Sequence, residues 1–184
     1  MAVSTPAPDL GKKCPDFLLP GVDGRTYALR DFAASKCLLM VFTCNHCPYA
    51  RAVEDRIITL QREYPQGALQ VVAVCSNDAV TYPDDARPKL AERWREKQMP
   101  FPYLHDEAQE TARAFGAVCT PDFFLYDQDR ALRYRGRLDD NWKEPDKVTR
   151  RELKEAVDLL LAGRHPGDAQ NPSMGCSIKW KKDA

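Results

Sequence analysis

Apolar and polar positions along the chain follow two periods, and these predict an alternation of strands and helices. The unbroken apolar runs at 37–42 and 69–74 are typical of strands buried on both faces of a sheet. After each run, apolar residues recur at helical spacing, which predicts helices over about 48–64 and about 84–98. This part of the chain therefore reads as βαβα.

Two hairpins and two further helices are predicted in the rest of the chain. Turn-forming residues separate short apolar stretches within 14–30 and within 123–135, a pattern that predicts antiparallel hairpins. Asp106 is a plausible N-cap for a helix that ends at Gly116. Apolar residues at helical spacing over 153–161 predict the last helix.

The order of these elements predicts the α/β class and a single domain over 1–184. The core is expected at about 10–162, and 163–184 is expected to form a polar tail without a period. A length of 184 residues suits one domain with a substantial buried core.

Composition excludes several classes of function. The 27 basic and 27 acidic residues cancel, so we expect neither nucleic acid nor an anionic membrane as a partner. No apolar stretch is long enough to span a bilayer, and residues 1–9 have no signal-peptide pattern, so we expect a cytoplasmic location. Seven cysteines are an odd number for a disulfide framework and, in a reducing compartment, should be mostly thiols unless they are catalytic.

Two cysteines stand where the first apolar run gives way to helical spacing. Cys44 and Cys47 lie one helical turn apart, and Pro48 fits a first helical turn, where its missing N–H has no intrahelical partner. Unpaired N–H groups and the helix dipole stabilise a thiolate at such a position, so we expect nucleophilic sulfur. A protonated His46 would stabilise the thiolate further and make the pair a stronger oxidant.

A zinc site and simple burial are the alternatives to redox chemistry for this pair. The chain offers further potential ligands, but none of them forms a second C-x-x-C or an H-x-x-x-H pair: Cys14, Cys37, Cys75, Cys119, Cys176 and three histidines. Structural zinc sites usually take four ligands at paired spacings. We therefore assign no metal and favour redox use of Cys44 and Cys47.

With C-x-x-C after the first buried strand, the order of elements resembles the thioredoxin fold over about residues 10–162. The resemblance implies a cis peptide bond at Thr120-Pro121, beside the two sulfurs. It also implies that the backbone of Thr120 is free to pair with an extended substrate segment.

The segment 101–116 goes beyond the minimal thioredoxin pattern and looks like the insertion of the redoxin branch, which includes peroxiredoxins of the alkyl hydroperoxide reductase and thiol-specific antioxidant type. The phrases around Cys44–Tyr49, Val118–Phe124 and Gly175–Lys181 are similar to a peroxiredoxin-like thioredoxin-family group. This resemblance implies a thioredoxin-like three-layer αβα fold with an N-terminal β-hairpin and a redoxin-type insertion.

Two mechanisms follow from the resemblance. In a thiol-disulfide oxidoreductase, Cys44 is the more exposed nucleophile and Cys47 resolves the mixed disulfide. In a thiol peroxidase, Cys47 aligns with the peroxidatic residue, either sulfur of the pair attacks the hydroperoxide, and the resolving thiol is its partner, Cys119 or Cys176.

Thr43 stands where thioredoxins usually carry tryptophan, and we group it with His46 as a residue that tunes the thiolate. The substrate is accordingly a disulfide-bearing protein or a hydroperoxide. No flavin or nicotinamide fingerprint is present, so no cofactor is expected, and an external thiol reductase system should supply the electrons. A metal-binding or redox-sensing module is the non-enzyme alternative.

Overall fold

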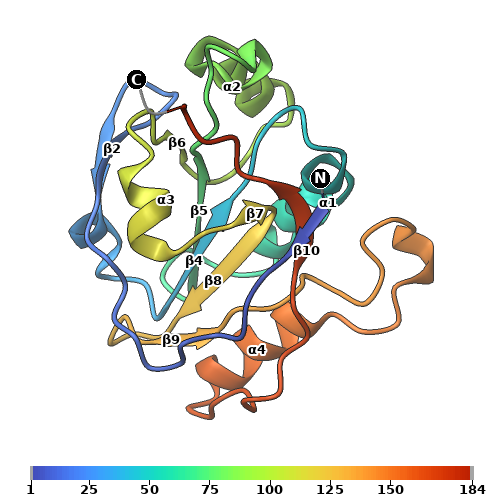
Figure 1. The fold of residues 1–184 in the computed structure, drawn as a ribbon. Coiled ribbons are helices and arrows are strands. Elements are labelled where there is room, and N and C mark those ends of the chain that lie inside the picture. The colour runs from blue at the N-terminus through green and yellow to red at the C-terminus, as the bar shows by residue number, and fades with distance from the viewer. Residues whose placement is uncertain (1, 183–184) are drawn as a thin grey trace.

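A five-stranded mixed sheet forms the middle of the molecule in the computed structural model, which describes residues 2–182 (Figure 1). Its strands, in spatial order, are β6 (Tyr103–His105), β5 (Leu69–Cys75), β4 (Cys37–Phe42), β8 (Asp122–Tyr126) and β9 (Leu132–Tyr134). β4 lies at the centre, parallel to β5 and antiparallel to β8. Because it is covered on both faces, all six of its residues are buried.

Helices and a hairpin cover the two faces of this sheet (Figure 1). Leu39 and Val41 face a cluster formed with α1 (Pro48–Arg62) and α4 (Glu152–Leu161), which Leu90 of α2 (Arg87–Glu96) joins. Leu38, Met40 and Phe42 face the opposite cluster. That cluster is formed with α3 (Glu110–Phe115) and the antiparallel hairpin of β2 (Leu18–Pro20) and β3 (Thr26–Ala28).

The strands, helices and hairpins predicted from the periodicities are present, and the three-layer αβα arrangement is confirmed. Boundaries differ at two helices. α2 begins at Arg87, after a separate 3-10 turn at Pro83–Asp85. α3 begins at Glu110 rather than beside Asp106, although the Asp106 carboxylate still accepts hydrogen bonds from the backbone of that helix. Two more 3-10 turns span Leu29–Phe32 and Pro145–Lys147.

A second sheet of three short strands lies over the end of the main sheet and was not predicted (Figure 1). Its order is β1 (Ala2–Ser4), β10 (Met174–Ser177) and β7 (Cys119–Thr120), with both pairs antiparallel. The segment 163–184, expected to be a polar tail without a period, thus supplies the middle strand, and its last two residues lie outside the described part. Four residues that include a glycine and a serine carry too little apolar alternation to predict a strand.

Across residues 2–182, no helix has both the length and the apolar character needed to cross a bilayer.

Candidate active site

The cysteine pair lies where the central strand passes into α1. Cys44 follows the end of β4, and Cys47 is the N-cap of α1, with Pro48 as the first helical residue. Both side chains are buried, with 3% of Cys44 and none of Cys47 exposed, and both are free thiols. The pair therefore lies at a helix N-terminus, as the sequence predicted.

Thr120, on β7 of the second sheet, contacts both cysteines. Its hydroxyl is 3.3 Å from Sγ of Cys44, and its carbonyl oxygen accepts a 3.0 Å hydrogen bond from Sγ of Cys47. The Thr120–Pro121 peptide bond is cis, as the resemblance implied. The contact with both sulfurs agrees with the predicted place of Thr120 and Pro121 beside the pair. The backbone of Thr120 is not free, however, because it pairs with β10 of the same chain.

The two thiols have different electrostatic surroundings. The hydrogen bond from the Cys44 thiol lowers the pKa of Cys47 from 9.0 to about 4, with help from the Thr120 side chain and the Ala50 N–H at the start of α1. The pKa of Cys44 is raised because this bond favours its protonated form, because it is buried and because the Asp85 carboxylate is near. Of the two thiols, Cys47 is therefore the more readily ionised, and its ionisation gives up the hydrogen bond to the Thr120 carbonyl.

A buried carboxylate that sequence reasoning missed organises the residues between the sulfurs. Asp85 is fully buried and accepts hydrogen bonds from Nδ1 of His46 at 2.6 Å, from the backbone N–H of Asn45 at 2.8 Å and from Nδ2 of Asn77 at 2.8 Å. The His46 ring also stacks on Tyr82, with centroids 4.9 Å apart. These contacts fix the orientation of His46 beside the sulfurs.

No local pattern in the sequence connects Asp85 or Asn77 with the cysteines. Asn77 follows a buried strand at the edge of the sheet where the cysteines also lie, and that is the one signal that could have drawn attention to it. Asp85 belongs to a short 3-10 turn, and nothing in the local sequence of such a turn indicates a functional carboxylate.

Cys44, His46 and Asp85 bring one potential ligand atom each to within 4.8 Å of one another. Hydrogen bonds already account for this cluster, because both oxygens of the Asp85 carboxylate have donors from the protein. Over residues 2–182, this is the one such cluster, and the cysteines weighed as zinc ligands do not extend it.

The two candidate resolving cysteines differ in position. Cys119, on β7, is fully buried, and its thiol lies 3.5 Å from the Pro121 carbonyl oxygen. Cys176, on β10, is half-buried, stands opposite Thr120 and packs against the cluster that contains Cys44 and Cys47. Thr43 lines a small cavity with Glu54 and Tyr103, and its backbone N–H donates to the Val74 carbonyl.

Two cavities are lined by residues that neighbour the pair, although neither Cys44 nor Cys47 lines them. One of about 120 Å³ lies beside Pro121, where Tyr49, Trp142 and Met174 line it. The other, about 310 Å³ and polar, begins at Asn45 and His46.

Comparison with known proteins gives a consistent result. The model of the AhpC/TSA family matches residues 10–135. An uncharacterized conserved protein from Geobacillus kaustophilus is 42% identical over 100% of this chain and 98% of its own, with a TM-score of 0.92.

Two solved structures of redox proteins are more distant. A putative thiol:disulfide interchange protein DsbE from Chlorobium tepidum is 26% identical over 84% of this chain and 96% of its own, with a TM-score of 0.59. The peroxidoxin BcpB from Mycobacterium tuberculosis is 20% identical over 83% of this chain and 94% of its own, with a TM-score of 0.58, and shows the fold alone. No curated protein matches the chain.

Proposed function

The chain belongs to the AhpC/TSA family, and we propose on this basis that it is a thiol-disulfide oxidoreductase whose Cys44–Cys47 pair cycles between dithiol and disulfide. One observation carries the proposal: two free thiols lie at the N-terminus of α1, and both contact Thr120, which precedes a cis proline. The lowered pKa of Cys47 agrees with this arrangement. A thiolate that is present at neutral pH and adjoins a second thiol has what disulfide exchange requires.

The reaction begins at Cys47. Its thiolate attacks one sulfur of a substrate disulfide, forms a mixed disulfide and releases the other substrate sulfur as a thiolate. Cys44 then loses its proton and attacks the Cys47 sulfur, which forms the Cys44–Cys47 disulfide and releases the second substrate thiolate. The substrate gains two electrons and the protein loses two. An external thiol reductant returns them.

This order reverses the roles first expected from the thioredoxin resemblance, in which Cys44 attacks. The surroundings of the sulfurs support the reversal, since Asp85 disfavours a thiolate on Cys44, whereas the helix N-terminus favours one on Cys47. His46, oriented by Asp85, has a ring nitrogen within 4.8 Å of the Cys44 sulfur. We retain a cytoplasmic location as part of the proposal.

A thiol peroxidase is the second candidate, and it is supported by the low pKa of Cys47, the residue that aligns with the peroxidatic position. The thiolate would attack the O–O bond of a hydroperoxide, become a sulfenic acid and release an alcohol or water. A thiol would then displace water from that sulfenic acid to form a disulfide.

The test compares the two oxidants on one protein. Fully reduced protein is mixed in a stopped-flow instrument with hydrogen peroxide or with oxidised glutathione, and the disulfides formed are mapped by mass spectrometry. Faster reaction with glutathione disulfide and a Cys44–Cys47 product supports the oxidoreductase, whereas a peroxide rate far above that of a free thiol supports the peroxidase. Cys47→Ser should abolish either reaction. Unchanged rates in that variant would refute both proposals.

A further inference from the structure

Strand β10 occupies the backbone edge at which a thioredoxin-like site was expected to receive a substrate. Cys176 is the antiparallel partner of Thr120, and Ser177 that of Cys119. On either side of this pairing, the Ser173 hydroxyl donates to the Pro121 carbonyl at 2.9 Å and the Ile178 N–H to the Val118 carbonyl at 3.1 Å. The chain thus supplies its own strand at this edge.

The register of that pairing sets which way Cys176 points. Residues directly opposite in an antiparallel pair project to the same face, so the side chain of Cys176 shares a face with that of Thr120. The Thr120 hydroxyl on that face is 3.3 Å from Cys44. Cys119 belongs to the alternate position, on the other face. The second sheet carries two cysteines, Cys119 and Cys176, and of these it is Cys176 whose side chain lies on the same face as Cys44 and Cys47.

β10 also approaches the pair closely. At Gly175, a Cβ atom would lie 2.0 Å from the Thr120 carbonyl oxygen, the same oxygen that accepts the Cys47 hydrogen bond. Glycine therefore lets the strand pack directly against the backbone carbonyl that Cys47 contacts. Cys47 and Cys176 are near enough for each to affect the ionisation of the other.

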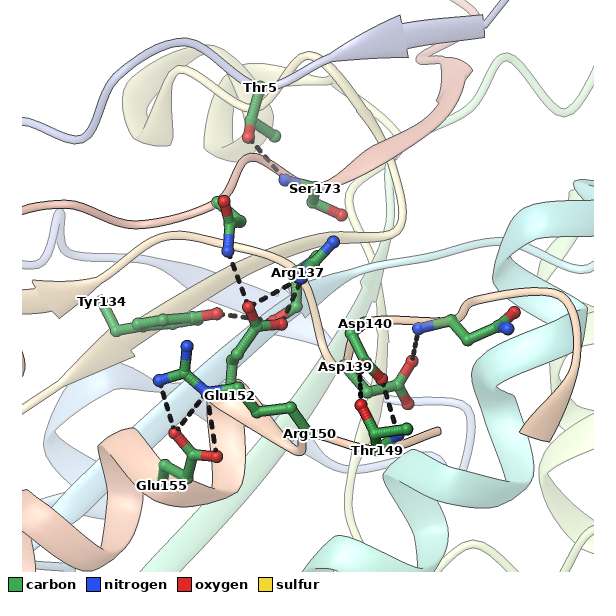
Figure 2. Close-up of polar contacts among 12 residues, drawn as sticks. Thr5, Tyr134, Arg137, Asp139, Asp140, Thr149, Arg150, Glu152, Glu155 and Ser173 are labelled. Carbon is green, nitrogen blue, oxygen red and sulfur yellow. Dashed lines mark hydrogen bonds and ion pairs between the residues drawn. The ribbon is translucent and has the colours of Figure 1, made fainter. Parts of the chain in front are cut away.

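Contacts on both sides hold β10 in this place. It pairs with β1 along its other edge, and just before it the Ser173 N–H donates to the Thr5 hydroxyl at 3.0 Å (Figure 2). Asn171, three residues before β10, is tied to α4 because its side-chain amide donates to Glu152. Arg137 holds the same Glu152 carboxylate (Figure 2). After β10, the Lys179 N–H donates to Asn77, which also binds Asp85. Little chain entropy remains to be lost when Cys176 reacts.

From this geometry we propose that Cys176 is a third redox thiol, which resolves the mixed disulfide on Cys47 within one chain. In this proposal β10 of the same chain pairs with Thr120 where an extended, disulfide-bearing polypeptide substrate would otherwise pair. The proposal rests on the thiol-disulfide activity proposed above. The oxidant is then a small disulfide, because the Thr120 backbone that a polypeptide would pair with is already occupied.

The chemistry is an exchange of sulfur partners. The Cys47 thiolate attacks a small disulfide RSSR, giving Cys47–S–S–R and RS⁻. The Cys176 thiol loses its proton and attacks the Cys47 sulfur, which forms Cys47–Cys176 and releases the second RS⁻. Both RS⁻ groups take up protons, so RSSR becomes two RSH and the protein loses two electrons. Cys44 can then attack Cys47 to give Cys44–Cys47 and return Cys176 to the thiol.

The test removes the competing thiol and follows the product. Reduced Cys44→Ser protein is treated with oxidised glutathione, quenched with acid at a series of times and examined by mass spectrometry without reduction. We expect the Cys47–glutathione mixed disulfide to appear and convert to an intramolecular Cys47–Cys176 bond. In Cys44→Ser/Cys176→Ser the mixed disulfide should persist, with at least a tenfold loss in the rate at which the second glutathione is released. Cys44→Ser/Cys119→Ser is the matched control and should behave as Cys44→Ser.

The possible failures are distinct. Persistence of the mixed disulfide in Cys44→Ser, with Cys44–Cys47 still forming in the wild type, would overturn the role of Cys176 and leave the proposed function intact. A chain in which Cys47 never forms the mixed disulfide would overturn both. If the mixed disulfide persisted in Cys44→Ser/Cys119→Ser but not in Cys44→Ser/Cys176→Ser, Cys119 would be the resolving thiol. That result would also overturn the assignment to Cys176.

Discussion

Nδ1 of His46 and the buried carboxylate of Asp85 are joined by a 2.6 Å hydrogen bond, which links the residue between the two sulfurs to a turn 39 positions away. The same carboxylate raises the pKa of Cys44. The asymmetry between the two thiols thus depends partly on a residue outside the C-x-x-C motif.

Replacing Asp85 by Asn should lower the pKa of Cys44, because a nearby negative charge is removed. The change is easiest to measure in a Cys47→Ser background, because the second thiol of the pair no longer titrates there. Thiolate absorbance at 240 nm is then followed as a function of pH. Loss of a well-satisfied buried acceptor should also destabilise the fold by about 1–3 kcal/mol. Asp84→Asn in the same background is the control. Identical titration curves for the two variants would contradict this role of Asp85.

The Cys47 thiolate should persist in the reduced protein far below the ordinary thiol range. Absorbance at 240 nm should fall only as the pH approaches about 4, and Cys47→Ser should lack this transition. Because the folded-state pKa lies below the unfolded value, the thiolate contributes stability that is complete above about pH 9 and is lost as the pH falls through the folded-state pKa. The stability difference between wild type and Cys47→Ser should therefore shrink on acidification. A single transition near pH 9 would refute the low pKa.

Gly175→Ala should displace β10 from β7. The added Cβ would lie 2.0 Å from the Thr120 carbonyl oxygen, and the other close atoms are also backbone atoms, of Thr120 and Pro121, which cannot swing aside as a flexible side chain can. We expect a loss of about 1–3 kcal/mol in the free energy of unfolding by urea, the usual range for overpacking. Gly167→Ala is the control, since a Cβ there has no neighbour within 4 Å. Equal stability of the two variants would mean that β10 tolerates a larger separation from Thr120.

A buried ion pair next to Pro121 should matter more than any surface pair. Arg135 donates to Asp122 at 2.8 and 3.2 Å, and Asp122 is fully buried. Arg135→Ala leaves that carboxylate without its partner, so we expect a loss of about 3–5 kcal/mol near neutral pH in urea denaturation. Burial raises the pKa of Asp122, and the loss should shrink as the pH falls, since a protonated Asp122 needs no partner charge.

Arg150→Ala is the control for the ion pair. Arg150 binds Glu155 on the exposed surface of α4 (Figure 2), so its removal should change stability little. A comparable loss in both variants would contradict the special weight given to the Asp122–Arg135 pair.

Local periodicity was sufficient to predict the central strands, the long helices and the helix-start position of Cys44 and Cys47. These features depend on residues close together in sequence. The place of Thr120 and Pro121 came from the family resemblance, because cis proline has no local signature. Asp85 and β10 could not be predicted, since each acquires its role from a partner far away in the chain: Asp85 binds Asn45 40 positions before it, and Ser177 pairs with Cys119.

The position of β10 between β1 and β7 also has a consequence for biosynthesis. Residues 174–177 are synthesised long after residues 2–4 and 119–120, so the second sheet cannot close until β10 has left the ribosome. Until then Cys44 and Cys47 have emerged without the strand that covers Thr120. A nascent chain would therefore be open to stray thiol exchange until β10 emerges and pairs with β7.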